Sequence, residues 1–99
     1  MKEVKIDQII NYLNDLNIID IRDNFRFNIK HIPNAKNIPM NFLIMNPKNY
    51  LDINETYYIY CEMGVNSQEV CERLTDLGYD VVNIVGGFNE YKLLEHLTK

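Results

Sequence analysis

The stretch TYYIYCEMGVNS, residues 56–67, decides the fold because it joins a buried strand to a helix through a short loop. Thr56–Tyr60 is rich in β-branched and aromatic side chains, which is typical of a strand. Cys61 follows directly, and Gly64 supplies the backbone freedom that a tight loop requires. Apolar residues at helical spacing predict a helix over 67–77. The stretch therefore predicts a strand, a loop and a helix, with a cysteine at the carboxyl end of the strand.

The rest of the chain repeats this alternation on both sides of the stretch. Further short strands are expected at 18–21, 37–38 and 81–85. Helices are expected at 7–16 with Asp7 as its cap, at 26–30, at 40–45 and at 88–97. Strands that alternate with helices indicate an α/β fold with a parallel sheet and helices on both faces. Because the sequence has no repeat, linker or low-complexity segment, we expect one domain over residues 1–99.

Composition excludes several classes of function. The 99 residues are 46% hydrophobic and 24% charged, as in a globular protein that is not embedded in a membrane. No apolar run approaches the roughly 20 residues that span a bilayer, and the first residues do not resemble a secretory signal. The net charge of -4 argues against nucleic acid or an anionic membrane as the main partner.

The two cysteines are expected to be independent, reduced thiols. Cys61 and Cys71 are separated by a predicted helix, which places their Cα atoms beyond the roughly 7 Å limit for a disulfide. Reduced thiols in a chain without a signal peptide indicate a cytoplasmic protein. Cys71 lies on the apolar face of the predicted helix, so core packing is favoured over a role as a second reactive thiol.

The position of Cys61 favours nucleophilic chemistry. Ligands of open α/β sheets bind at the carboxyl ends of the strands, where Cys61 is expected. A tight loop around Gly64 and the start of the next helix would direct N–H groups at the sulfur and favour the thiolate, which is the nucleophile. The alternative is that Cys61 is a small core side chain at the end of a strand. The residues alone leave both interpretations open.

Four motifs resemble those of the rhodanese family and occur in the same order. Together they cover nearly the whole chain. They are IIDIR at 18–22, KHIPNAKNIP at 30–39, IYCEMGVNS at 59–67 and LGYDVVNIVGGF at 77–88. The third resembles the strand and active loop of the family, and the fourth resembles its closing signature. The chain is therefore identified as a single-domain member of the rhodanese-like family, with a three-layer fold and a five-stranded parallel sheet.

The resemblance implies that Cys61 accepts a sulfane sulfur as a persulfide and passes it to a thiol or cyanide. It implies a donor such as thiosulfate or a persulfide, an acceptor that is a small thiol or a protein thiol, and no metal or organic cofactor. The binding loop would consist of the residues Glu62, Met63, Gly64, Val65, Asn66 and Ser67. Asp20 and Arg22, expected to form a structural ion pair, and the loop histidine His31 would support the site.

Two residues in the loop predict a preference among donors. Asn66 stands where the family often has arginine, and Glu62 places a carboxylate beside the nucleophile. Both changes disfavour an oxyanion, so we expect thiosulfate to be a poorer donor than a persulfide. The same residues leave open a non-catalytic binding or sulfur-relay module. A phosphatase or arsenate reductase is disfavoured, because the loop from Cys61 to Asn66 has the length typical of sulfurtransferases.

Overall fold

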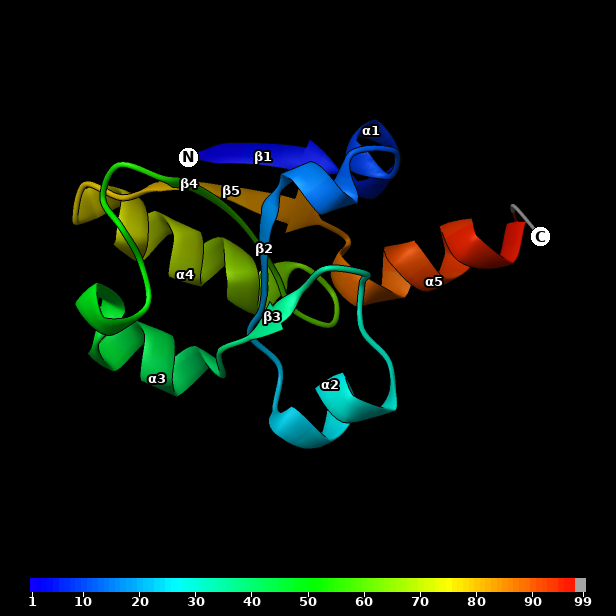
Figure 1. The fold of residues 1–99 in the computed structure, drawn as a ribbon, viewed down its shortest axis with the longest axis horizontal. Helices are drawn as coiled ribbons and strands as arrows, with labels where there is room; N and C mark the ends of the chain where they lie inside the picture. The colour runs from blue at the N-terminus through cyan, green and yellow to red at the C-terminus, as the bar shows by residue number, and fades with distance from the viewer. Residues whose placement is uncertain (98–99) are drawn as a thin grey trace.

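A parallel β-sheet forms the centre of the molecule, with helices on both of its faces (Figure 1). The structure is a computed structural model that describes residues 1–97. Within these residues the sheet has five strands in the order β1-β5-β4-β2-β3, all paired in parallel. The strands are β1 (Lys2–Lys5), β2 (Asn17–Asp20), β3 (Lys36–Asn37), β4 (Thr56–Tyr60) and β5 (Asp80–Val85). The predicted three-layer α/β fold is confirmed.

The helices are short. They are α1 (Ile6–Ile9), α2 (Asn24–Ile29), α3 (Met40–Met45), α4 (Val65–Asp76) and α5 (Gly87–Leu97), with 3₁₀ turns at Leu13–Asp15 and Pro47–Asn49. None of the helices described within residues 1–97 is long and apolar enough to cross a membrane.

The two faces of the sheet carry separate apolar clusters because successive strand residues point to opposite sides. Ile19 and Ile59 belong to the cluster that α3 and α4 cover. Ile18 and Tyr60, their chain neighbours, belong to the cluster that α1 and α5 cover. Burying each such side chain contributes about 1.5–3 kcal/mol, so both helical layers are held on by apolar contact.

The region before residue 17 differs from the sequence prediction. Lys2–Lys5 forms strand β1 at the edge of the sheet, where no strand was expected. The helix predicted over 7–16 with Asp7 as cap is wrong, because α1 spans only Ile6–Ile9. Lys5 occupies the cap position, and its backbone N–H donates to the side chain of Gln8 at 2.9 Å. The exposed β1 gave little apolar signal, which explains why the pattern did not reveal it.

The helix after Cys61 begins two residues earlier than predicted. It starts at Val65 rather than at Ser67, and Gly64 precedes it in the left-handed conformation with φ of 90°. Asn66 and Ser67 therefore lie in the first turn of α4 rather than in the loop. This shift places a helix N-terminus closer to Cys61, and it matters for the site.

Candidate active site

Cys61 lies at the carboxyl end of β4 and is 6% exposed. Two backbone N–H groups donate to its Sγ atom, that of Gly64 at 3.1 Å and that of Ser67 at 3.3 Å. Ser67 belongs to the first turn of α4, whose N-terminal end carries a partial positive charge. The sulfur therefore lies where negative charge is stabilised by the backbone alone.

The N-terminus of α5 holds the carbonyl groups of the loop. The N–H of Phe88 donates to the Cys61 carbonyl, and the N–H of Asn89 donates to the Glu62 carbonyl, both at 2.9 Å. In a trans peptide the N–H points opposite to the C=O. The N–H groups of Glu62 and Met63 are therefore directed away from α5.

Glycines allow this close approach of the loop and the turn before α5. A Cβ atom on Gly87 would lie 2.3 Å from the Cys61 carbonyl oxygen. A Cβ atom on Gly64 would lie 2.7 Å from the backbone nitrogen of Gly86. Side chains at these positions would separate the two segments, so the shape of the loop depends on their absence.

A cavity of about 390 Å³ opens at Cys61. It is lined by Ile21, Arg22, Asp23, Arg26, Met40, Cys61, Glu62 and Asn66. The loop residues thus face segments that follow β2 and begin α2 and α3. A small ligand in this cavity would contact both the sulfur and guanidinium groups.

Arg22, one of the residues that line this cavity, belongs to a buried ion pair. Asp20 accepts hydrogen bonds from the Arg22 backbone N–H at 2.8 Å and from its Nη2 at 2.7 Å. Tyr60 donates its hydroxyl to Asp20 at 2.6 Å. Burial, followed by the Asp20 carboxylate, raises the pKa of Tyr60 far above its usual value, so the hydroxyl stays a donor. The predicted pair of Asp20 and Arg22 is present, and it fixes the guanidinium at the cavity.

Comparison with known proteins decides the family. The family model described as Rhodanese-like domain matches residues 5–94.

The chain belongs to the rhodanese-like domain family.

Named relatives agree with this assignment. The chain is 32% identical over 79 residues to thiosulfate sulfurtransferase GlpE of Coxiella burnetii, covering 79% of this chain and 73% of that protein. It is 34% identical over 77 residues to adenylyltransferase and sulfurtransferase uba4 of Ogataea parapolymorpha, covering 75% of this chain but only 19% of that protein. A crystal structure of a rhodanese-like domain protein from Staphylococcus aureus superimposes with a TM-score of 0.83 and 38% identity, covering 92% and 91% of the two chains.

The six residues expected to form the binding loop do not all lie at the cavity. Glu62 and Asn66 line the cavity, and Gly64 and Ser67 contact the sulfur. The side chains of Met63 and Val65 are strongly exposed and lie outside the lining. The structure therefore gathers four of the six around Cys61 and turns two toward the surface.

Glu62 faces Arg22 rather than standing unopposed beside the thiol. Its Oε2 atom lies 3.6 Å from Nη1 of Arg22. The guanidinium offsets part of the negative charge that the sequence places next to Cys61. The electrostatic penalty for an anionic donor is therefore smaller than the sequence alone implies.

His31 supports the structure at a distance from the sulfur. Its Nδ1 donates to the Phe27 carbonyl at 2.9 Å, and its ring stacks on that of Phe27 with centroids 3.8 Å apart. His31 is not among the described residues that line the cavity. The expectation that it is mostly structural agrees with this placement.

Sequence reasoning missed five residues of the site, among them Ile21 and Asp23, which line the cavity. Arg26 and Met40 line the cavity, and Asn83 is buried behind the loop. Asn83 stands between apolar residues in β5, and a polar side chain inside a buried strand indicates a specific hydrogen-bond partner. That signal was available in the sequence. The approach of α2 to the cavity could not be predicted from the sequence, because it depends on the path of the chain after β2.

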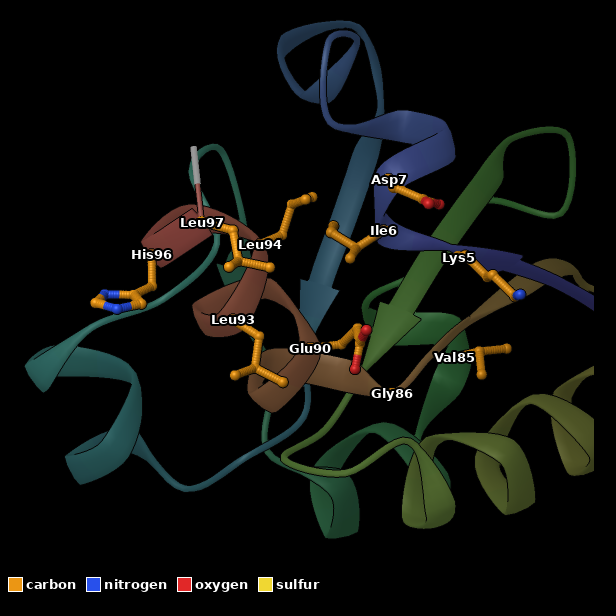
Figure 2. A pocket seen from close by; sticks show the side chains of 10 residues that line it. All are labelled: Lys5, Ile6, Asp7, Val85, Gly86, Glu90, Leu93, Leu94, His96 and Leu97. Atoms are coloured by element: carbon orange, nitrogen blue, oxygen red, sulfur yellow. The ribbon is translucent and has the colours of Figure 1, made fainter. Parts of the chain in front are cut away.

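A larger cavity of about 440 Å³ lies elsewhere, beside α5 and the carboxyl ends of β1 and β5 (Figure 2). Leucines of α5 and Ile6 give it an apolar lining, whereas Figure 2 shows His96 turned away from the other side chains. Neither cysteine is among the described residues that line it. Within residues 1–97, no group of three or more His, Cys, Asp and Glu side chains is placed to hold a metal ion.

Proposed function

We propose that this protein is a sulfurtransferase that carries a sulfane sulfur as a persulfide on Cys61. The observation that carries the proposal is the convergence of the Gly64 and Ser67 N–H groups on Sγ of Cys61, a residue that lines a cavity. Such donors stabilise a sulfur anion, which is the reactive form of cysteine. The names of the relatives, thiosulfate sulfurtransferase and sulfurtransferase, support the same chemistry.

The reaction divides into two transfers at one nucleophile. In the first, the Cys61 thiolate attacks the outer sulfur of the donor, a new S–S bond forms, and the donor leaves with the electron pair of the broken bond. The N–H groups of Glu62 and Met63, directed away from α5, stabilise the charge on the transferred sulfur. In the second, an acceptor thiolate or cyanide attacks that sulfur, and Cys61 leaves as a thiolate.

Charges around the cavity favour an organic persulfide over thiosulfate. Arg22 is paired with Asp20 and faces Glu62, and Arg26 is paired with Asp23. The guanidinium groups are thus opposed by carboxylates and offer little net attraction to a dianion. A persulfide brings less charge and depends less on such attraction.

The acceptor is a small thiol, cyanide or a protein thiol. The protein acts in the cytoplasm, where a reducing environment keeps Cys61 and Cys71 as the free thiols that the structure contains. The chemistry uses Cys61 and the backbone, and it requires no metal or organic cofactor.

A second candidate function is a non-catalytic binding or sulfur-relay module. Asn66 gives it weight, because an exposed neutral amide replaces a group able to grip an oxyanion. In a binding module the cavity would bind a partner and Cys61 would remain without sulfur, whereas in a relay Cys61 would hold sulfur without catalysing its transfer to a small acceptor.

Intact mass after incubation with a sulfane-sulfur donor separates the two functions. We expect an adduct of one sulfur atom in the wild-type chain and in Cys71→Ala, and none in Cys61→Ala. Cys71 is a matched control because it is a second buried thiol in the same apolar cluster. A chain that accepts sulfur from neither thiosulfate nor a persulfide would support the binding module.

A further inference from the structure

A chain of hydrogen bonds runs from Cys61 into the interior of the protein, away from the cavity. Sγ of Cys61 lies 3.3 Å from Oγ of Ser67, and Oγ lies 2.6 Å from Oδ1 of Asn83. The other end of the Asn83 amide, Nδ2, lies 3.4 Å from the Gly64 carbonyl oxygen. Ser67 and Asn83 are almost completely buried, with exposed fractions of 0% and 2%. Water therefore does not compete for these bonds.

The direction of each hydrogen in this chain follows from the partners. The Gly64 carbonyl only accepts, so the NH₂ group of Asn83 faces it and the amide oxygen faces Ser67. The amide oxygen also only accepts, so the Ser67 hydroxyl must donate its single hydrogen to Asn83. Ser67 then presents lone pairs to Cys61, and the contact between them is a bond that the thiol S–H donates.

We infer that Asn83 is a positioning residue that, through the Ser67 hydroxyl, stabilises the thiol and the persulfide of Cys61 at the expense of the free thiolate. This inference rests on the proposed function. When the thiol loses its proton to solvent, Sγ carries a negative charge against an oxygen lone pair. The hydroxyl relieves this only by rotating toward the sulfur and giving up its bond to Asn83.

The persulfide does not meet the same penalty. Its charge lies on the outer sulfur in the cavity, while the inner sulfur is neutral and accepts from the N–H groups of Gly64 and Ser67. Discharge breaks the S–S bond, returns the electron pair to Sγ and recreates the disfavoured thiolate. Asn83 thus slows discharge, as suits a protein that holds its sulfur until an acceptor arrives.

The charged and titratable groups near Cys61 lie on the cavity side and in the core. Replacing Asn83 removes none of them. The titratable and charged groups are Arg22 after β2, Asp23 and Arg26 at α2, Glu62 in the loop and Cys71 in α4. The α3 sequence, MNFLIM, contributes none. Asn83→Leu, which is nearly isosteric and uncharged, therefore tests the direction of the hydroxyl without changing any charged group, although it also removes the hydrogen bond to the Gly64 carbonyl.

The test measures the rate at which iodoacetamide alkylates Cys61 as a function of pH, in the full chain. We expect Asn83→Leu to free the hydroxyl for donation to the sulfur, shifting the alkylation profile to lower pH. At pH 7 alkylation should be about three- to tenfold faster. Discharge of a preloaded persulfide to cyanide should also be faster, because a more stable thiolate is a better leaving group.

Ser67→Ala supplies the decisive comparison, since it removes the lone pairs but keeps the backbone N–H. In the wild-type background it should leave alkylation as fast or faster, and in the Asn83→Leu background it should slow alkylation. This reversal of sign is not expected from loss of structure, which exposes Cys61 to the reagent and changes the rate in the same direction in both backgrounds. A slower rate for Ser67→Ala alone would show that the hydroxyl already donates to Cys61 and would overturn the inference, even if Asn83→Leu does not fold. Alkylation requires no sulfur donor, so failure of the proposed function would be seen separately, as the absence of a persulfide.

Discussion

Cys61 and Cys71 belong to one apolar cluster, yet their surroundings differ sharply. Cys61 ends a strand, faces a cavity and receives two backbone N–H bonds. Cys71 lies inside α4, is completely buried, and burial raises its pKa to about 12. Both thiols are nearly inaccessible to solvent, so burial does not distinguish them. The difference is the orientation of neighbouring peptide groups, which the turn at Gly64 and the start of α4 provide for one thiol only.

Replacing each thiol gives the largest expected difference between the two. Cys61→Ser should reduce sulfur transfer at least about a thousandfold, because the covalent intermediate cannot form. Cys71→Ser should retain transfer within a few-fold and reduce the free energy of unfolding, because it buries a hydroxyl. Steady-state cyanide assays and urea titrations measure the two effects. Equal loss of transfer in both variants would contradict the assignment of different roles to Cys61 and Cys71.

Gly64→Ala should show how much of the transfer rate depends on the shape of the loop, because it leaves the Cys61 thiol in place. A side chain at φ of 90° costs about 1–2 kcal/mol, and its Cβ would lie 2.7 Å from the Gly86 nitrogen. We expect a transfer rate reduced about tenfold or more, because the N–H donors move away from Sγ.

Gly78→Ala is the matched control for this change. Gly78 has φ of 94°, but its Cβ would meet only a side-chain atom of Ile53, at 3.7 Å. It shares the cost of a side chain at positive φ but not the backbone clash, so it should cost less stability than Gly64→Ala and leave transfer unchanged. If Gly64→Ala transfers sulfur as fast as Gly78→Ala, the loop geometry is not what activates Cys61.

Glu62→Gln should show how much the negative charge at the Cys61 cavity lowers the rate with an anionic donor. Removing one carboxylate charge near a dianion is worth about 1 kcal/mol in water-like surroundings, which is about fivefold in kcat/KM for thiosulfate. A persulfide donor should gain less. Kinetics with both donors at low and high salt provide the check, because the gain should shrink as salt screens the charge. An equal gain for both donors would contradict the charge argument.

The ionisation of Cys71 should affect stability at alkaline pH only. Its pKa is about 12 in the folded chain against an ordinary 9.0, so between these values the folded state keeps a proton that the unfolded state loses. The free energy of unfolding should therefore fall as pH rises through this window, and below pH 9 the contribution is complete. Urea titrations at pH 8 and 10 should show a smaller fall in Cys71→Ala than in the wild-type chain. Tyrosines with raised pKa act in both chains, so the difference isolates Cys71.

The sequence predicted the elements whose side chains carry a strong pattern. Thr56–Tyr60 was located to the residue because every position is β-branched or aromatic. Lys2–Lys5 was missed because it lies at the sheet edge, where mostly exposed side chains leave no apolar alternation. The start of α4 was misplaced because Gly64, rather than a polar cap, precedes it.

The site was predicted as far as it is local in sequence. The loop from Cys61 to Ser67 and the pair of Asp20 and Arg22 were identified from neighbouring residues. Arg26 could not be, because its place at the cavity depends on how α2 folds back after β2. The binding of loop carbonyls by α5 also escaped prediction, because it joins segments that are far apart in the chain.

The contact between the loop and the start of α5 has a consequence for protein engineering. Since Phe88 and Asn89 hold the carbonyls of Cys61 and Glu62, the heptapeptide alone does not encode its own conformation. Grafting it into another scaffold would transfer the thiol but not the N–H groups that donate to its sulfur. A successful transplant would have to carry the diglycine turn and the first residues of α5 along with it, as one discontinuous module.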